Sequence, residues 1–529
     1  MGVGRGIRRH FRHARLAPRA MFAEVRNTRC PLADVLITHS YHLPYDPKQV
    51  RKMQPYPPLG MLYAATALRQ RGISVAAFDS MIENPSEQFL ICLNAHQPKI
   101  VVVYEDDFNF LSKMCLTRMQ DVAWEIAKAA KMSGAVTIVH GSDSTDNPAL
   151  FLHKGFDYVL CGEAEETLSE ICICILRNAA IPALDCLVRL GCQGQVLRSG
   201  QRLAKNPSWP NLPIPARDLI DLGPYRHAWQ KAHGQFSLNM VSSRGCPYRC
   251  NWCAKPISGD TFLLRAAANV AQEMLQLKLC AGAQHIWFGD DVFALDHRWI
   301  REFADEVTIR DASLPFKIQS RANLMTESTV KHLKRAGCAE VWMGVESGSQ
   351  FVLDAMDKGL RLDAIICARE RLQQAGIRAC YFLQFGYPGE YWPQLQETIA
   401  FVRATRPDDV GISFSYPLPG TVFYERVKIQ LGSKRNWLDS DDLCIMFKAA
   451  YKTEFYRAVR EALHAEVESW HDSIEPVSER VCIGKLWRIV EEMEPVSRQA
   501  DTFASCETAD ITDIPAFVSV DTLASSRES

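Results

Sequence analysis

The sequence predicts an α/β protein built on two parallel sheets, and two observations support this. Short apolar runs alternate with segments of helical periodicity from about residue 31 to 170, and again from 236 to 430. This alternation is typical of parallel sheets whose strands are joined by helices. In both regions the polar and glycine-rich stretches come directly after the apolar runs. Because ligands bind beyond the carboxyl ends of parallel strands, we expect a binding site in each region.

Length and composition are those of an ordinary soluble protein of two or three domains. Of the 529 residues, 47% are hydrophobic and 23% are charged, and the net charge is −1. This charge gives no argument for nucleic acid or an acidic membrane as partner. No stretch of about 18 apolar residues lacks charges, so we predict no membrane span. The 18 cysteines are scattered and no secretory signal precedes them, which favours a reducing, cytoplasmic setting.

The first 30 residues differ from the rest because they are strongly basic. Arginine occurs eight times before residue 30, and the first acidic residue is Glu24. The segment has no apolar core, so it is not a secretory signal. We expect a disordered basic arm over 1–30, or an overlong gene start with Met21 as the true initiator. An organelle transit peptide is the alternative.

The first α/β region, residues 31–200, is predicted to form a Rossmann-like doubly wound sheet. Its five apolar runs are read as strands at 34–38, 75–78, 100–104, 137–140 and 157–160. The segments after the strands are long and rich in small or polar residues, as a large ligand requires. Residues 201–235 then carry repeated prolines and are read as a linker or a strap across the surface.

The second region, residues 236–430, is predicted to form a partial (β/α)6, TIM-like barrel. Six strand–helix units are expected, with strands at 236–241, 285–288, 316–319, 340–343, 378–384 and 409–414. In such a barrel the active site lies at the carboxyl ends of the strands. A small helical region is expected over 431–495. Residues 496–529 are rich in Ser, Thr, Ala and Asp, which predicts a disordered tail.

Three cysteines follow the first strand of the second region. Cys246, Cys250 and Cys253 have C-x3-C-x2-C spacing. Thiolates are soft ligands, so the cluster indicates zinc or an iron–sulfur cluster. Three thiolates would leave one iron of a four-iron cluster open to a non-protein ligand. A structural zinc site would need a fourth ligand nearby, but the nearest candidates, Cys280 and His285, follow an intervening predicted helix.

The cysteine loop, with Trp252 just before its last cysteine, resembles the cluster-binding loop of radical S-adenosylmethionine (SAM) enzymes. The resemblance implies a [4Fe–4S] cluster on Cys246, Cys250 and Cys253, with SAM chelated at the open iron. Reduction of the cluster would cleave SAM and yield a 5′-deoxyadenosyl radical, so the cofactor carries the hard chemistry. The resemblance also implies a small-molecule substrate and an external one-electron donor of flavodoxin or ferredoxin type.

Further motifs at the expected strand ends support the same resemblance. Asp290 and Asp291 stand where this family binds the amino group of SAM, although the usual Gly-Gly-Glu is absent here. Glu346 and Ser347 lie in a stretch that is similar to the ribose and methionine contact region, with Glu346 as the implied hydroxyl acceptor.

The last two strand ends carry Gly386 and Pro388, and Pro419, which resemble the segments near the adenosine and the substrate. Each of these motifs taken singly is read equally well as a turn. Arg321 follows another strand and has two readings, a carboxylate contact or a surface salt bridge.

The N-terminal region resembles the cobalamin-binding subgroup of the same family. The resemblance implies cobalamin contacts at the stretch after residue 55 and at two later strand ends, namely at Tyr56, Pro58, Leu59, Gly60, Gly141, Gly162 and Glu163. The motif Asp-x-His-x-x-Gly is absent, which implies a cobalamin without a protein histidine below cobalt, or a domain that no longer binds it. Lone histidines near the strand ends (His39, His42, His140 and His153) are read as surface or hydrogen-bonded residues.

The two resemblances imply a cobalamin-dependent radical SAM enzyme. Methyl transfer to an unactivated carbon is the leading reading of its activity. Oxidative cyclisation or rearrangement with the same cofactors is the second, as in the anaerobic porphyrin-ring cyclases of this subgroup. A non-catalytic protein with zinc on the three cysteines is the alternative from another class.

Overall fold

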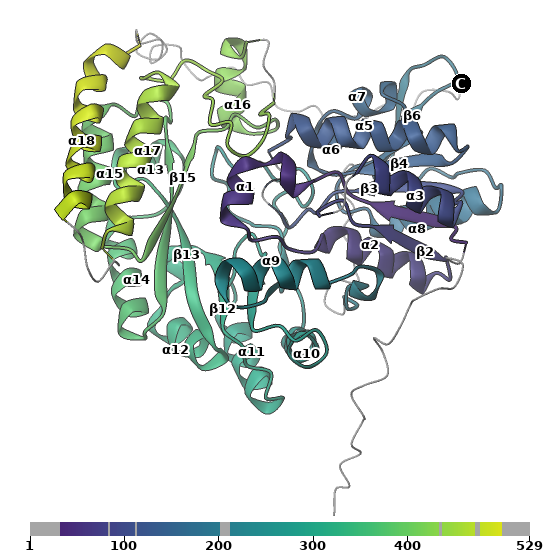
Figure 1. The fold of residues 1–529 in the computed structure, drawn as a ribbon, viewed down its shortest axis with the longest axis horizontal. Coiled ribbons are helices and arrows are strands. Elements are labelled where there is room, and N and C mark those ends of the chain that lie inside the picture. The colour runs from purple at the N-terminus through teal and green to yellow at the C-terminus, as the bar shows by residue number, and fades with distance from the viewer. Residues whose placement is uncertain are drawn as a thin grey trace, which may run out of the picture.

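The computed structural model describes residues 32–82, 85–109, 111, 114–200, 212–432, 436–470 and 477–499, with the side chains of 477–481 excepted. The basic arm, residues 201–211 of the strap and residues 500–529 lie outside this range. The described chain forms two α/β units side by side, followed by a helical C-terminal region on the second unit (Figure 1).

The N-terminal sheet has seven strands in the order β2-β1-β3-β4-β5-β6-β7. Its first five strands are parallel and confirm the five predicted from the sequence: β1 Val35–Thr38, β2 Val75–Phe78, β3 Ile100–Tyr104, β4 Val136–His140 and β5 Tyr158–Leu160. The order 2-1-3-4-5 is that of a doubly wound sheet, whose ligands bind where the order reverses, between β1 and β3. This reversal point sets the ligand edge of the first unit.

Helices on both faces explain why these strands are continuous apolar runs. One face is covered by α2 Leu59–Gln70 and α8 Glu165–Leu176. The other is covered by α3 Glu87–His96, α5 Thr117–Met132 and α7 Pro148–His153.

The hairpin of β6 Leu187–Leu190 and β7 Val196–Ser199 extends the sheet antiparallel to β5, and the sequence analysis did not predict it. Most of its residues are exposed, so it lacks the apolar run by which the inner strands were recognised.

A strap joins the two units. It contains the 3-10 turn Arg217–Leu219 and helix α9 Gly223–His233, and it leads into the first strand of the second sheet. Trp229 of α9 donates a hydrogen bond from Nε1 to the carbonyl of Pro55, 2.7 Å away. The strap is therefore fixed to both units.

The C-terminal sheet has six parallel strands in the order β15-β14-β13-β12-β11-β8. They are β8 Ser237–Met240, β11 His285–Phe288, β12 Phe316–Ser320, β13 Cys338–Glu346, β14 Arg378–Phe385 and β15 Asp409–Phe414. All six predicted strands are confirmed. The helices between successive strands, in chain order, are α10 Ala267–Leu279, α11 His297–Ile309, α12 Glu327–Ala336, α14 Leu362–Gln374 and α15 Trp392–Thr405. β8 and β15 are the two edge strands.

The helical C-terminal region consists of α16 Val422–Val427, α17 Thr453–Glu468 and α18 Val477–Ser497. Helix α17 packs against β15, and α18 packs against α17. Because α18 runs to Ser497, residues 496 and 497, which were expected in the tail, are helical, and the tail expected over 500–529 lies outside the described residues. In the described part of the chain, no helix is both long and apolar enough to cross a membrane.

Candidate active site

The three cysteines lie on a loop between the short strands β9 Ser243–Arg244 and β10 Leu263–Leu264, which pair with each other. Gly245 opens this loop with φ +83°, and a Cβ there would lie 2.3 Å from the carbonyl oxygen of Thr261. Only glycine fits this turn. Cys246, Cys250 and Cys253 form no disulfide with any described residue and are partly exposed. The loop therefore presents three thiols beyond the carboxyl end of β8.

Asn251, which was not singled out from the sequence, holds the loop in place. Its Nδ2 donates to the carbonyl of Ala355 at 2.8 Å and to Asp357 at 2.9 Å. The hydroxyl of Tyr387 donates to Asn251 Oδ1 at 2.7 Å, and the backbone N–H of Phe423 donates to its carbonyl at 2.9 Å. One buried amide thus ties the cysteine loop to the segments that follow β13, β14 and β15. It carried no sequence signal, because its partners are distant in the chain.

Arg321 brings a buried cation to the cysteine loop. Its Nη1 lies 3.6 Å from Cys250 Sγ, and its guanidinium stacks 3.8 Å from the centre of the Tyr248 ring. Its Nη2 donates to the carbonyl of Lys358. The side chain is buried and no carboxylate pairs with it in the described chain, so the surface salt bridge read from the sequence is wrong, and the contact to a carboxylate stays a prediction. A buried cation beside the loop complements the negative charge that a metal-bound thiolate carries.

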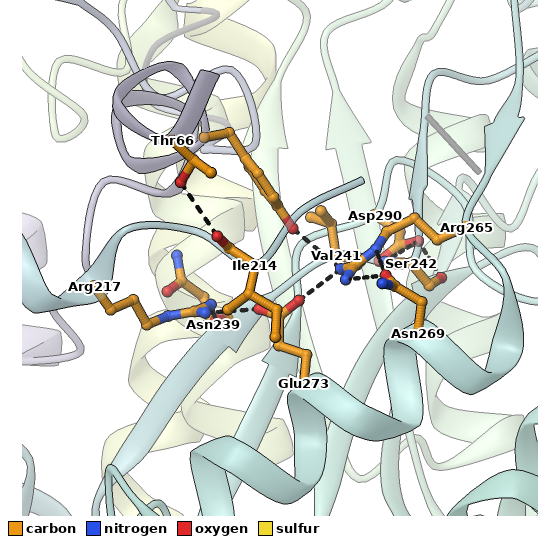
Figure 2. Close-up of polar contacts among 11 residues, drawn as sticks. Thr66, Ile214, Arg217, Asn239, Val241, Ser242, Arg265, Asn269, Glu273 and Asp290 are labelled. Atoms are coloured by element: carbon orange, nitrogen blue, oxygen red, sulfur yellow. Dashed lines mark hydrogen bonds and ion pairs between the residues drawn. The ribbon is translucent and has the colours of Figure 1, made fainter. Parts of the chain in front are cut away.

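A buried ionic network supports the strand that leads into the loop (Figure 2). Glu273 of α10 accepts from Arg217 of the strap at 2.7 Å and forms an ion pair with Arg265, whose Nη1 lies 2.7 Å from its Oε2. Arg265 Nη1 also donates to the carbonyl of Val241 at 2.6 Å, and Arg217 Nη2 donates to that of Asn239 at 2.7 Å. The end of β8 is therefore fixed by charged groups that are themselves paired.

Asp290 also fixes the segment that follows β8. Its carboxylate accepts from the backbone N–H and the hydroxyl of Ser242 (Figure 2), and also from the hydroxyl of Ser243. Burial raises its pKa to about 6, against these hydrogen bonds, which lower it. The neighbouring Asp291 is exposed and lies within electrostatic reach of Cys246. Of the two predicted SAM contacts, Asp291 is the one that the structure leaves accessible beside the loop.

Glu346 ends β13 in an unusual conformation. Its φ is +64°, at an irregularity in the pairing with β14. Its Oε1 lies 2.7 Å from Lys358 Nζ, and both side chains are buried. A non-glycine residue in the left-handed region at a strand end is typical of functional sites. Ser347, predicted beside it, instead shares a 2.9 Å hydrogen bond with Thr398 of α15 and secures the turn.

The motif after β14 contains a buried carboxyl group. Gly386 has φ +82°, and its backbone N–H donates to Glu390 at 2.5 Å. Burial raises the pKa of Glu390 to about 8, so this carboxyl is largely neutral at pH 7. Pro388 and Pro419 are partly exposed at the ends of β14 and β15. The structure confirms a turn at each position and leaves their role in ligand binding as a prediction.

Buried polar atoms near these strand ends make no hydrogen bond within the described chain. They are Ser349 Oγ after β13, Gln384 Oε1 on β14, Ser415 Oγ after β15 and Trp252 Nε1 in the cysteine loop. An unsatisfied buried polar atom is costly, so such a group needs an explanation. A polar ligand above the carboxyl ends of the strands would satisfy them.

A second ligand edge lies on the N-terminal sheet, where the strand order reverses. A small pocket opens there, between the ends of β1, β3 and β4 and helix α5. Ser40, Glu105 and Gly141 are among the residues that line it. A Cβ on Gly141 would lie 2.8 Å from Glu105 Cγ, so glycine keeps this wall open. Tyr104 Oη, His140 Nδ1 and Ser142 Oγ nearby are buried and make no hydrogen bond to any described residue.

A buried ion pair joins the two ligand edges. Arg244, two residues before Cys246, donates from Nη2 to Glu165 at 2.6 Å, and its Nη1 lies 3.8 Å from Glu163. All three side chains are at most 4% exposed. Arg244 lowers the pKa of Glu165 against the effect of burial. Glu163, predicted as a cofactor contact, thus faces the cysteine loop, and sequence reasoning missed its partner.

The other predicted residues of the first unit have different places. Gly162 accepts a 2.7 Å hydrogen bond from His140, beside the pocket. Tyr56 does not line the pocket. It bonds Ser237 of β8 at 3.0 Å and packs between Trp229 and Trp287.

Pro58 precedes α2, and Leu59 contacts the interface residues Leu212 and Val241. Gly60 donates its N–H to Asp106 at 3.0 Å. Pro58, Leu59 and Gly60 thus fix the turn at the start of α2.

Two family models match the chain over the segments just described. Residues 53–172 match the B12 binding domain, and residues 240–402 match the radical SAM superfamily. The chain is a cobalamin-dependent radical SAM enzyme. The first match spans the N-terminal ligand edge, and the second spans the cysteine loop and the strand ends through β14.

Relatives of this enzyme carry methyltransferase and cyclase names. It is 25% identical over 380 residues to an uncharacterized methyltransferase of Pyrococcus horikoshii, covering 70% of this chain and 78% of the relative. It is 23% identical over 314 residues to bacteriochlorophyllide d C-12(1)-methyltransferase of Chlorobaculum tepidum, covering 58% and 63%. It is 22% identical over 231 residues to an anaerobic magnesium-protoporphyrin IX monomethyl ester cyclase of Synechocystis, covering 42% and 43%. The chain thus spans less than two thirds of these last two relatives.

Solved structures share the fold of this radical SAM enzyme. The radical SAM methyltransferase TsrM from Kitasatospora setae, with cobalamin and a [4Fe–4S] cluster bound, gives a TM-score of 0.61 at 18% identity over 75% of each chain. The cobalamin-dependent radical SAM enzyme OxsB gives 0.64 at 16% identity, covering 88% of this chain and 71% of its own.

The cofactors of the enzyme are a [4Fe–4S] cluster, SAM and cobalamin, and the residues present fit them. The loop offers three accessible thiols without a fourth cysteine, and the strand ends above the C-terminal sheet offer unsatisfied polar atoms. The N-terminal pocket lies where the strand order reverses, the place at which a doubly wound sheet binds its ligand. Among the described residues, no group of three or more His, Cys, Asp or Glu side chains is arranged to hold a single metal ion.

Proposed function

We propose that this enzyme methylates an unactivated carbon of a small-molecule substrate. When bound, the cluster supplies the electron that cleaves SAM, and the corrinoid supplies a carrier for a methyl group. The observation that carries the proposal is the Arg244 ion pair, because it joins the loop of the first cofactor to the unit of the second. The methyltransferase names among the relatives support the same reading.

In this proposal the chain's own residues position and protect the reacting groups. Cys246, Cys250 and Cys253 hold the cluster, while Asn251 and Arg321 fix the loop that carries them. Asp291 and Glu346 contact SAM, and the pocket at Gly141 receives cobalamin. The six parallel strands in sequential order support a partial barrel, whose carboxyl ends face the N-terminal unit. Fixing two ligands on one rigid frame is positioning catalysis.

An external one-electron donor and a reducing, cytoplasmic setting belong to the proposal. Thiolate ligands are best kept in a reducing compartment.

Product analysis tests the proposed reaction. Anaerobically reconstituted enzyme with its substrate should form S-adenosylhomocysteine beside 5′-deoxyadenosine. If 5′-deoxyadenosine and product form without S-adenosylhomocysteine, methyl transfer is wrong. The second candidate, cyclisation or rearrangement with the same cofactors, would then hold, as the cyclase names among the relatives suggest.

A further inference from the structure

A group of basic side chains gathers beside the edge strand β15, outside the cofactor sites. Lys48 and Lys52 lie on helix α1 Pro47–Lys52, Arg460 and His464 on α17, and Lys317 on β12. Lys48 is within electrostatic reach of Lys52 and of Arg460. Lys52 is also within electrostatic reach of Lys317. His464 is within electrostatic reach of Lys48, Lys52 and Arg460. Three elements that are distant in sequence thus bring five basic groups together. Hereafter these five side chains are the basic cluster.

Contacts to the C-terminal region fix α1 in this place. Gln49 Nε2 donates to Ser440 Oγ at 3.2 Å, and Arg51 pairs with Asp441 at 2.7 Å. Asp46 caps the helix and accepts from Ser440 Oγ at 2.6 Å. Figure 1 shows α1 between the N-terminal unit and the side of the second unit that carries β15 and α17. The cluster is therefore held on a rigid frame.

The cations of the basic cluster lack acidic partners. Within the described residues, Lys48, Lys52, Lys317 and Arg460 make no ion pair within 4 Å. The acids nearby are used elsewhere: Asp441 pairs with Arg51, and Glu340 with Arg378 at 2.5 Å. Asp409 and Asp46, both within electrostatic reach of Lys52, are the exceptions, since they make no ion pair in the described chain, although Asp46 accepts hydrogen bonds from Ser440. Two carboxylates cannot balance four cations.

The cluster costs free energy in the absence of a ligand. Burial, and then the neighbouring cations Lys52 and Arg460, lower the pKa of Lys48 to about 8. Burial, and then the neighbouring cations Arg460, Lys52 and Lys48, lower the pKa of His464 to about 4. Lys48, Lys317, Arg460 and His464 are nevertheless half-buried and Lys52 is exposed, so a ligand can enter. Unpaired charges with restricted hydration favour a bound anion.

We propose that Lys48, Lys52, Lys317 and Arg460 bind the anionic group, a carboxylate or a phosphate, of the small-molecule substrate. The planar fork of arginine and the ammonium of lysine are the usual partners of these groups. The inference rests on the proposed function, since it assigns the substrate of the same enzyme. It defines that substrate as an acid rather than a neutral or cationic molecule.

The position of Lys317 connects the basic cluster to the cysteine loop. Lys317 and Arg321 are four residues apart along β12 and its end, so they lie on the same face of the sheet, roughly 13 Å apart. Arg321 touches Cys250, whereas the Lys317 ammonium lies 5.7 Å and 5.9 Å from the ring centres of Tyr56 and Trp287. An acid bound at the cluster could thus extend its apolar part along these rings toward the loop.

Lysine acylation measured by mass spectrometry tests the cluster without the substrate. The full-length protein is labelled at pH 8 with inorganic phosphate, acetate or chloride at equal ionic strength. Lys48 should react faster than the exposed Lys331 of α12, because more of its amine is neutral at this pH. Phosphate or acetate should slow labelling of Lys48 and Lys52 but not of Lys331. A preference for one anion tells which acidic group is bound.

Variants make the test decisive. Arg460→Gln should weaken protection by phosphate about tenfold or more, because a charged hydrogen bond is lost. Arg460→Lys should restore part of it, and Lys331→Gln should change nothing. Equal protection of Lys331, an effect of chloride as large as that of phosphate, or unchanged protection in Arg460→Gln would overturn the inference. SAM cleavage without substrate reports on the proposed function separately, so cleavage with no anion protection overturns the basic cluster alone.

Discussion

The two ligand edges of this enzyme are built in different ways. The edge of the C-terminal sheet presents reactive side chains, three thiols on a loop held by Asn251 and by the ionic network under β8. The edge of the N-terminal sheet instead contains a pocket, which Gly141 keeps open and which few charged groups line. A metal cluster needs specific donor atoms, whereas a corrinoid needs mainly space and scattered polar contacts. The first edge is therefore marked by a short motif, and the second is not.

The largest expected effect comes from removing one loop cysteine, which should disable the C-terminal ligand edge and leave the N-terminal one intact. Cys250→Ala should abolish the cluster and SAM cleavage, because the loop then keeps two thiols, and it should leave cobalamin retention intact. Iron and sulfide analysis, absorbance near ~400 nm and cobalt analysis measure this. Cys367→Ala, at an exposed cysteine of α14, is the matched control and should retain all three. Loss of cobalt together with iron would show that the edges are not independent.

The next effect concerns the contact between the edges. Arg244→Met should lower the free energy of unfolding by about 3–5 kcal/mol, because Glu165 and Glu163 are left buried without their cation. Arg335→Met removes an exposed pair with Asp305 and should cost about 1 kcal/mol at most. Denaturant unfolding measures both. Similar losses for the two variants would contradict a special role for the Arg244 pair.

Two buried carboxyl groups, one at each ligand edge, have pKa values shifted in opposite directions. Arg244 lowers the pKa of Glu165, whereas burial raises that of Glu390 to about 8. A raised carboxyl pKa means that the folded protein holds an extra proton, so wild-type stability is lost as pH rises from about 4 to about 8. Glu390→Gln removes the group that binds this extra proton. Over the same pH range, the free energy of unfolding of the variant should therefore fall less than that of the wild type, by on the order of a few kcal/mol. Urea unfolding at pH 5 and 8.5 measures it, and equal pH slopes would disprove a neutral Glu390.

The smallest effect tests the pocket. Gly141→Val should weaken cobalamin retention about tenfold or more, because the new side chain meets Glu105 and narrows the pocket. Iron content should be unchanged. Gly432→Val, at a glycine with open space around it, is the control. If cobalamin is retained equally by both variants, the cofactor lies elsewhere.

The sequence predicted the elements better than the contacts between them. All eleven parallel strands were readable because buried parallel strands are continuous apolar runs. Cys246, Cys250 and Cys253 were readable because their ligand chemistry depends on spacing. The support that Asp290 gives to the loop was not predicted, because only its contact with Ser242 in the folded chain shows it. The Arg244 pair and the basic cluster join residues from separate elements, and one sequence carries no signal for such pairs.

Metal analysis of the anaerobically reconstituted wild-type protein tests the two-cofactor arrangement most directly. The structure predicts about four irons and one cobalt per chain, with iron lost selectively in Cys250→Ala and cobalt lost selectively in Gly141→Val. Stoichiometric zinc without iron, or a protein that never retains cobalt, would contradict it.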